Sequence, residues 1–364
     1  MAITVAAGLR ALDTLKLATA LEASGTAPNE AQAEQLSSWT GWGILSPAFN
    51  PNPEGTWANI SDELLEILTP ERFRDASTSL DVSFFTPPAL VEAVWSLLGS
   101  AGFAGGRVLE PGCGVGAFLR GAPSGLDVDF HGIERDNTSA ALASMLHPGA
   151  KITAASLQDV HLAEGSYDAV IGNFPFASGH ISDGGGIYAS SLHEYFMRRS
   201  MLALRPGGYM AVVTSSHFMD STSLSRITED GGQFVAAVRL PEEMFADTGA
   251  TVVCDLILMR KAPEGEEGFA QPASSEYVLG YPVNSWWGTH PELVVGEFTA
   301  TTFYQRPLTV KCSDPGSALP AAVAAAKLLA AGRPMTDDDI IPQLEADPDV
   351  DGLKDGSYQL LTVD

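Results

Sequence analysis

From residue 106 onward, short β-rich runs alternate with helix-length spacers, and few folds are compatible with this alternation. The runs occupy residues 107–111, 127–134, 150–156, 167–173, 208–215, 233–240 and 251–261. Strands separated by helix-length segments predict βαβ units and a mostly parallel, doubly wound sheet. The last two runs are joined by only about ten residues, which favours an antiparallel pair over a crossover.

Helical segments are predicted on both sides of this region. Residues 8–36 place apolar side chains near a 3.6-residue period, with a break at SGTAPNE, and residues 62–78 form a second helical stretch. An Ala-rich helix is predicted over residues 318–331. We therefore expect four parts: a helical cap (1–80), an α/β domain (81–262), an extension packed on or near the core (263–312) and an acidic, Ala-rich tail (313–364).

The composition is that of a globular protein. A chain of 364 residues with 45% hydrophobic content can bury a full core. No window approaches the roughly 18 uninterrupted apolar residues of a membrane helix, and the first residues lack the features of a signal peptide, so we expect a cytoplasmic location. Cys113, Cys254 and Cys312 lack metal-ligand spacing, which predicts reduced thiols and no metal site.

The formal net charge of −25 argues against binding of nucleic acid by this chain alone. A protein that grips nucleic acid normally carries a basic patch that displaces counterions from the phosphates. Acidic residues on solvated surfaces can also simply keep a protein soluble. Any nucleic-acid function must therefore account for this charge.

The segment EPGCGVG, residues 110–116, lies between the first predicted strand and a helix that starts near residue 117. Its glycines allow a tight turn and a close approach of the backbone to a nucleoside. A purely structural turn or a dinucleotide loop could have a similar sequence. The carboxylate of Glu110 would repel a pyrophosphate and favours a cationic ligand instead.

Glu134 ends the second predicted strand, about twenty residues after the glycine turn. A carboxylate at this place commonly accepts hydrogen bonds from both hydroxyls of a ribose. An ordinary exposed acid at a strand end is the alternative. Taken together, the glycine turn and Glu134 indicate an adenosine-containing cofactor.

The segment IGNFPF, residues 171–176, follows the fourth predicted strand at the place where α/β sheets bind ligands. Glu110 suggests a sulfonium cofactor, and Asn173 could then hold an amine attached to an aromatic ring. Two acceptors, the amide oxygen and a backbone carbonyl, would draw its protons toward a tetrahedral arrangement and localise the lone pair. Pro175 stiffens the turn, and Phe176 can stack on a planar substrate. A hydrophobic turn with a capping Asn is the alternative.

The segments VLEPGCGVGAFL, GIERD and GNFPF, with FFTPP upstream, resemble the motifs of S-adenosylmethionine-dependent N6-adenine DNA methyltransferases of the gamma order. Over roughly residues 36–312, including WTGWGILSPAF and HPELVVGEF, the chain is similar to the methyltransferase module at the front of large phage and plasmid helicase-methyltransferase proteins. The resemblance implies a Rossmann-like class I methyltransferase fold. It implies a seven-stranded sheet, a helical N-terminal cap and a C-terminal extension.

The resemblance also implies roles for individual residues. The cofactor site would contain Thr86, Pro87, Glu110, Pro111, Gly112, Gly114, Glu134, Gln158 and Asn173. Asn173 and the carbonyl of Phe174, in the turn with Pro175, would hold the target amine, and Phe176 would stack on an adenine flipped out of the duplex. Phe245 and His193 are further candidates for substrate contacts, with core packing as the alternative for both.

Two positions depart from the family pattern. Phe174 stands where the family commonly has Pro, which keeps a backbone acceptor but loses some preorganisation. No acidic residue for the cofactor adenine is obvious after the third strand; Ser156, Gln158 and Asp159 are the groups available, and Asp159 is the least favoured.

The activity implied is methyl transfer from S-adenosylmethionine to the N6 amine of adenine in DNA, in a restriction-modification or antirestriction setting. The helicase portion of the relatives and a basic target-recognition domain are not recognisable in this sequence. We therefore expect slight sequence discrimination, or a partner subunit, such as a helicase or DNA-recognition protein, that supplies much of the grip on DNA.

Two other readings remain open. Methylases of protein glutamine or of RNA use a similar turn, because planar amides and bases pose the same chemical problem. A cofactor-binding subunit without catalysis, in a phage-defence or antirestriction complex, is a third reading. The intact Asn173 and glycine turn count against it, whereas Phe174 and the charge count in its favour.

Overall fold

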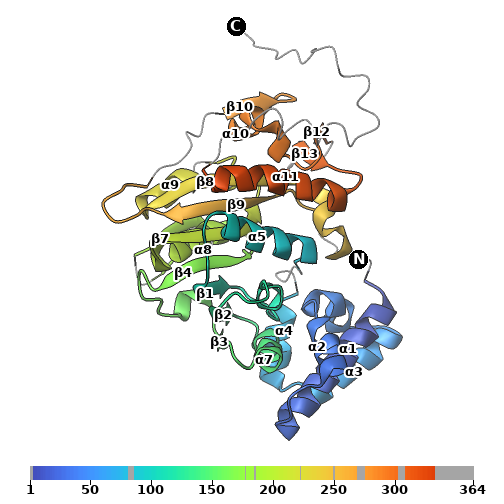
Figure 1. Cartoon of the computed structure of the whole chain (residues 1–364). Helices are drawn as coiled ribbons and strands as arrows, with labels where there is room; N and C mark the ends of the chain where they lie inside the picture. The colour runs from blue at the N-terminus through green and yellow to red at the C-terminus, as the bar shows by residue number, and fades with distance from the viewer. Residues whose placement is uncertain are drawn as a thin grey trace.

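A seven-stranded sheet forms the centre of the protein (Figure 1). This computed structural model describes residues 3–80, 86–176, 178–183, 186–221, 223–248, 251–268, 275–301 and 308–332. The strands, in spatial order, are β3 (Lys151–Ala154), β2 (Val128–Glu134), β1 (Gly106–Pro111), β4 (Tyr167–Asn173), β7 (Leu204–Ser215), β9 (Cys254–Lys261) and β8 (Gly232–Leu240).

All neighbouring strands from β3 to β7 are parallel, and β9 is antiparallel to both β7 and β8. The predicted mostly parallel, doubly wound α/β sheet is confirmed, together with the antiparallel pairing of its last two strands. Strands β4 and β9 are buried over most of their length, and their central residues are a continuous apolar run, because both faces of the sheet are covered. Their runs therefore lack the alternation of a half-exposed strand.

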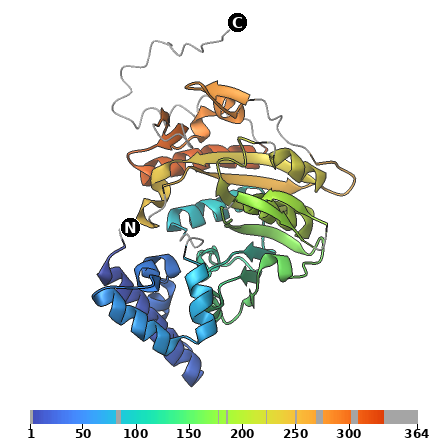
Figure 2. The same ribbon diagram turned by 180° about the vertical axis from the view of Figure 1, so that it is seen from behind.

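Helices cover both faces of the sheet. Figures 1 and 2 show α5 (Pro88–Ser100) and α11 (Pro315–Ala330) on one face, and α8 (Leu192–Ala203) and α9 (Ser223–Glu229) on the other. The predicted Ala-rich helix is confirmed as α11, and its apolar side chains belong to the same core cluster as the sheet. Further elements are α6 (Ala117–Arg120), α7 (Asn137–Leu146), η2 (Leu157–Asp159), β5 (Ser178–Ser182), β6 (Tyr188–Ser191) and η3 (Glu242–Thr248).

The N-terminal residues form a helical cap with its own hydrophobic cluster. The cap consists of α1 (Val5–Ser24), α2 (Glu30–Ser37), η1 (Trp42–Phe49), α3 (Thr56–Ile67) and α4 (Pro70–Thr78). The break predicted at SGTAPNE is confirmed: Gly25 ends α1 in the left-handed region, and Asn29 starts α2 with a capping box. Val115 and Leu142, from the region of the sheet, are part of the cap's cluster. The cap is therefore packed directly on the α/β region.

The segment after β9 adds β10 (Ser275–Val278), β11 (Tyr281–Asn284), α10 (Trp286–Thr289), η4 (Pro291–Leu293), β12 (Glu297–Ala300) and β13 (Leu308–Lys311). It is anchored by Arg239 of β8, whose side chain is 2% exposed. The guanidinium donates to Asp255 at 2.8 and 2.9 Å and to Asp220 at 2.8 Å, and it lies 4.3 Å from the ring centre of Trp287. The proposed division into four domains stays a prediction.

Among the described residues, no helix has the length and apolar composition that crossing a bilayer requires.

Candidate functional site

A cavity opens at the carboxyl ends of β1, β2 and β4, where a doubly wound sheet binds its ligands. The space between protein atoms there is about 1330 Å³, a figure that includes open solvent at the mouth. The residues expected in the cofactor site that line it are Thr86, Glu110, Gly112, Gly114, Glu134, Gln158 and Asn173. Phe174 and Pro175, from the expected catalytic turn, line it as well. The fold thus brings together residues that lie up to 89 positions apart in the sequence, from Thr86 to Pro175.

The glycine turn after β1 forms the floor of this cavity. Gly112 and Gly114 have φ angles of +76° and +54°, which side-chain-bearing residues rarely adopt. A Cβ atom on Gly114 would meet no atom within 4 Å, so the turn leaves open space beside its backbone. This space allows a ligand to approach the main chain closely.

Glu134 is held in place by two backbone donors. The N–H of Gly114 donates to Oε2 at 2.9 Å, and the N–H of Asp136 donates to Oε1 at 2.7 Å. Burial raises the pKa of this carboxyl, while the two backbone hydrogen bonds lower it. The carboxylate is therefore oriented at the cavity wall before any ligand arrives.

Glu110 is 2% exposed, and its Oε2 atom receives no hydrogen bond from the described residues. Burial raises the pKa of this carboxyl well above its usual value, and the nearby charge of Glu134 raises it further. A positive charge in the cavity would relieve both effects. The pair of carboxyls therefore favours a cationic ligand.

Asn173 ends β4, and its Oδ1 atom is buried without a hydrogen-bond donor in the described structure. The N–H of Phe174 donates to the carbonyl of Val213 in β7 at 2.9 Å, which ties the turn to the sheet. A buried amide oxygen without a donor is costly, so its presence in a cavity wall indicates a ligand that supplies one.

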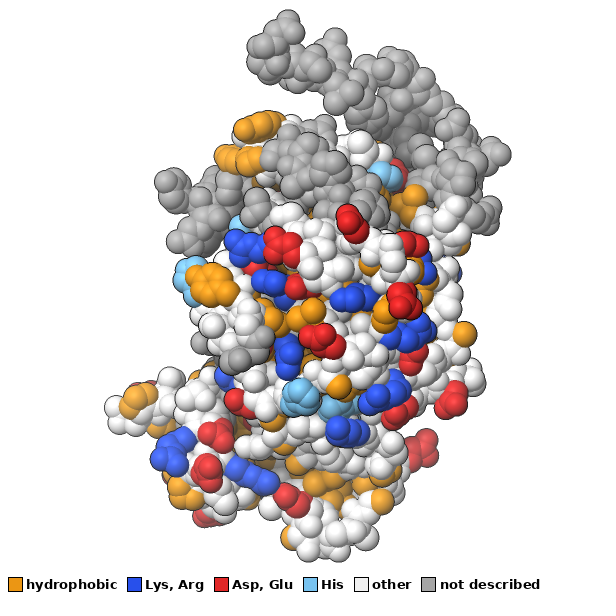
Figure 3. Space-filling view, turned by 90° about the vertical axis from the view of Figure 1, so that its left-hand side faces the viewer, with side chains coloured by type: hydrophobic (Ala, Val, Ile, Leu, Met, Phe, Trp, Pro, Cys, Tyr) orange, Lys and Arg blue, Asp and Glu red, His pale blue; other side chains and the backbone are white. Residues whose placement is uncertain are grey.

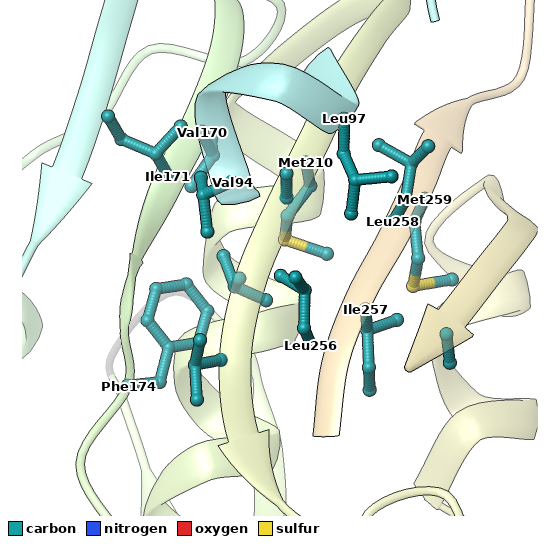
Figure 4. Close-up of a cluster of buried hydrophobic side chains, with 14 of the residues drawn as sticks. Val94, Leu97, Val170, Ile171, Phe174, Met210, Leu256, Ile257, Leu258 and Met259 are labelled. Atoms are coloured by element: carbon teal, nitrogen blue, oxygen red, sulfur yellow. The ribbon is translucent and has the colours of Figure 1, made fainter. Parts of the chain in front are cut away.

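Phe174 is 1% exposed and belongs to the same buried hydrophobic cluster as Ile171 and Leu256 (Figure 4). It also makes an edge contact with Phe196 of α8, with the ring centres 5.5 Å apart. The side chain that replaces the usual proline therefore fills space in the core and fixes the turn by packing.

Several predicted residues do not line the cavity. Pro87 and Pro111 lie next to it in sequence but are not part of its wall. Phe176 is half-buried and packs against the main core cluster, and Phe245 is 1% exposed within that cluster. For Phe245, this packing matches the alternative stated from the sequence. The stacking roles of both rings stay predictions.

His193 in α8 is 5% exposed and also lies outside the cavity wall. Neither ring nitrogen has a hydrogen-bond partner among the described residues, and its ring centre lies 6.4 Å from that of His217. Burial, with a smaller effect of His217, lowers the pKa of His193 to about 4. His193 is therefore neutral at physiological pH.

The helical cap forms part of the cavity wall, which was not predicted from the sequence. Trp39, Thr40, Gly41 and Ser79 form part of its wall, and Leu192 and Phe196 of α8 form another part. Trp39 and Trp42 are both buried, and Trp39 also contributes to the cavity wall. The available signal was the dense aromatic and glycine segment WTGWG, which lies where the cap meets the sheet.

No protein-family model matches the chain. A relative, the Defense against restriction protein B of Escherichia phage P1, is 27% identical over 214 residues. These residues are 57% of this chain and 9% of that protein, so the similarity concerns a small part of a much longer protein.

Solved structures similar to this chain include a candidate class I S-adenosylmethionine-dependent methyltransferase from Listeria monocytogenes. It is 17% identical, the match covers 74% of this chain and 92% of that one, and the TM-score is 0.44. The methyltransferase subunit of a type I restriction-modification system from Streptococcus thermophilus is 18% identical, with 57% and 54% covered and a TM-score of 0.44. The strand order of the central sheet, with its antiparallel strand β9, is that of a Rossmann-like, doubly wound α/β fold.

The residues of the cavity fit S-adenosylmethionine. The glycine turn leaves room beside its backbone, Glu134 presents an oriented carboxylate for a ribose, and the unpaired oxygen of Glu110 suits a cation. The described residues contain no group of three or more His, Cys, Asp or Glu side chains that could hold a metal ion.

Proposed function

We propose that the protein transfers a methyl group from S-adenosylmethionine to the N6 amine of adenine in DNA. One observation carries the proposal: the donor-free Oδ1 of Asn173 lines the same cavity as the donor-free Oε2 of Glu110. The first suits an amine and the second suits a cation, so the cavity can hold both reactants of a methyl transfer to nitrogen.

Asn173 and the carbonyl of Phe174 accept the two hydrogens of the amine. This arrangement localises a lone pair that would otherwise be delocalised into the ring. S-adenosylmethionine, held by the glycine turn, Glu110 and Glu134, would supply an electrophilic methyl: the nitrogen would gain the methyl and lose one proton, and the sulfur would leave with the electron pair of its bond to carbon. The buried cavity wall orients the amine and excludes bulk water from the reacting atoms.

The target adenine must leave the duplex to reach a buried amide. Phe176 is the proposed stacking partner for the flipped base, because it follows Asn173 and Pro175 in the same turn. Stacking on one aromatic ring contributes about 1–3 kcal/mol per base, which offsets part of the unstacking cost.

The similarity to the phage P1 protein favours DNA as the substrate and gives the reaction a setting. That relative is named for defence against restriction. Methylation of N6 changes a hydrogen-bond donor that proteins read in the major groove. We therefore propose that methylation by this protein alters how restriction enzymes read DNA, with a partner subunit contributing to DNA contact.

The test is a transfer assay with radiolabelled S-adenosylmethionine and three separate acceptors: unmethylated DNA, RNA and cellular protein. Products are digested to nucleosides or amino acids. We expect label in N6-methyladenine from DNA. Asn173→Ala should lose at least about 100-fold in rate, as expected when a group that stabilises the transition state is removed.

Asn52→Ala changes an exposed asparagine of the cap and should keep full activity. Cofactor binding is measured separately by calorimetry, so that a loss of binding in Asn173→Ala is distinguished from a loss of methyl transfer. If label appeared only in RNA or in protein glutamine, that molecule, and not DNA, would be the substrate. Cofactor binding without transfer to any acceptor would support the non-catalytic reading instead.

A further inference from the structure

We propose that Trp42, in the helical cap, is a positioning residue for cofactor binding and acts through Asp136 on Glu134. The inference deepens the proposed function and depends on the assignment of the cavity to S-adenosylmethionine. Trp42 itself is not among the residues that line the cavity.

A continuous chain of hydrogen bonds leads from the cap to the cofactor carboxylate. The indole N–H of Trp42 donates to Oδ1 of Asp136 at 3.0 Å, and the backbone N–H of Asp136 donates to Oε1 of Glu134 at 2.7 Å. Oε2 of Glu134 accepts from Gly114 in the glycine turn at 2.9 Å. The cap, the start of α7 and the glycine turn therefore meet at one carboxylate.

Asp136 depends on this donor because it is 8% exposed. Its second oxygen, Oδ2, accepts from the backbone N–H and the hydroxyl of Ser139, at 2.8 and 2.7 Å, and so caps α7. Trp42 supplies the hydrogen bond to Oδ1. Without it, a buried carboxylate oxygen would lose its donor, and Asp136 would have to shift toward water. We expect a shift of this residue to disturb the backbone N–H that orients Glu134.

Trp39 links the same interface to the ligand itself. Its ring lies 5.0 Å from that of Trp42 at 84°, and its indole N–H donates to the Ser139 hydroxyl at 3.2 Å. Among the described residues that line the cavity, Trp39 is the one tryptophan.

The test compares Trp42→Phe with Trp57→Phe. Trp42 is fully buried, and phenylalanine keeps an aromatic ring there while removing the N–H donor. Trp57 is a half-buried tryptophan of the same cap. Calorimetric titration with S-adenosylhomocysteine should show a Kd about tenfold higher for Trp42→Phe and unchanged for Trp57→Phe.

A purely structural role would affect the protein differently. The proposal expects KM for S-adenosylmethionine to rise by the same factor as Kd while kcat stays within about twofold, because only cofactor binding loses support. In an Asp136→Ala background, Trp42→Phe should cause little further loss, since both changes break one chain of contacts.

A measurement on the unaltered protein covers the case in which Trp42→Phe does not fold. Adding S-adenosylhomocysteine should slow hydrogen exchange of the Trp42 indole proton by a larger factor than that of Trp286, which donates to Ala237 in the core. An unchanged Kd in folded Trp42→Phe, or equal exchange rates at Trp42 with and without ligand, would overturn the proposal. Binding without methyl transfer would instead count against the proposed function alone.

Discussion

Glu110 and Glu134 place two carboxyls in one cavity, and their mutual effect makes binding sensitive to pH. The pKa of Glu110 is raised, first by burial and then by Glu134. Ionised Glu110 attracts a cation, whereas the protonated form does not, so a cationic cofactor lowers this pKa when it binds. Affinity for the cofactor must then increase as pH rises through the pKa of the free protein.

We predict that the Kd for S-adenosylmethionine falls with rising pH, by at most tenfold per pH unit for one proton, and then levels off. Glu110→Gln should flatten this dependence and bind more weakly at high pH. Calorimetry between about pH 5 and pH 9 covers the range in which a raised carboxyl titrates. Any titration of S-adenosylmethionine itself affects the unaltered protein and Glu110→Gln equally. If the Kd of both proteins changed with pH in the same way, Glu110 would not be the titrating group and the prediction would be contradicted.

Predicting the site residues from sequence was easiest where backbone chemistry demands a residue type. Glycines with positive φ and a strand-end carboxylate or amide have recognisable patterns, as at Gly114, Glu134 and Asn173. Phe245 could not be assigned in this way, because a ring that packs in the core and a ring that stacks on a base look alike in a sequence.

At the scale of elements, the strands buried on both faces were predictable because they are continuous apolar runs. The short β5–β6 and β10–β11 hairpins were not predicted, since four- and five-residue strands carry little periodicity. The wall that the cap contributes was also missed, because it depends on contacts between Trp39 and residues about 100 positions away. Local patterns do not encode such contacts.

The buried side chain of Arg239 anchors the C-terminal extension, and its removal should lower the stability of the protein. Arg239→Met should destabilise the protein by about 3–5 kcal/mol, because it leaves Asp255, which is fully buried, without its cation. Arg205→Met is the matched control: Arg205 also pairs with an aspartate, Asp168, but its side chain is 51% exposed, so the loss should stay within about 1 kcal/mol. Urea unfolding measures both changes, and equal losses would argue against the role of the buried anchor.

The positions of the basic side chains on the protein matter more for nucleic-acid binding than the net charge does. Arg107, Lys151 and Arg205 are exposed near the amino ends of their strands, at the edge of the sheet opposite the cavity. Figure 3 shows Lys and Arg side chains on this side of the molecule, interspersed with Asp and Glu. Arg135 is the basic residue among those that line the cavity. The described wall of the cavity therefore carries little positive charge.

We predict that the protein alone binds duplex DNA with a Kd above about 1 μM at physiological salt. The logarithm of the binding constant should fall with the logarithm of salt concentration with a slope no steeper than about −3, which corresponds to roughly three phosphate contacts. Fluorescence anisotropy across a salt series measures both quantities. A slope near −6 or steeper would show a basic DNA-binding surface and remove the reason to expect a partner.

The position of the segment after α10 has a consequence for solubility. Strand β8 lies at one end of the sheet, and the N–H of Val295 donates to the carbonyl of Arg239 at 2.9 Å, so this segment occupies part of the open edge. Strand β3, at the other end, is only four residues long and starts with a lysine. An uncovered, apolar β8 would be a template for edge-to-edge pairing between copies. We therefore expect the extension to limit pairing at this edge, and weakening the Arg239 anchor should increase self-association.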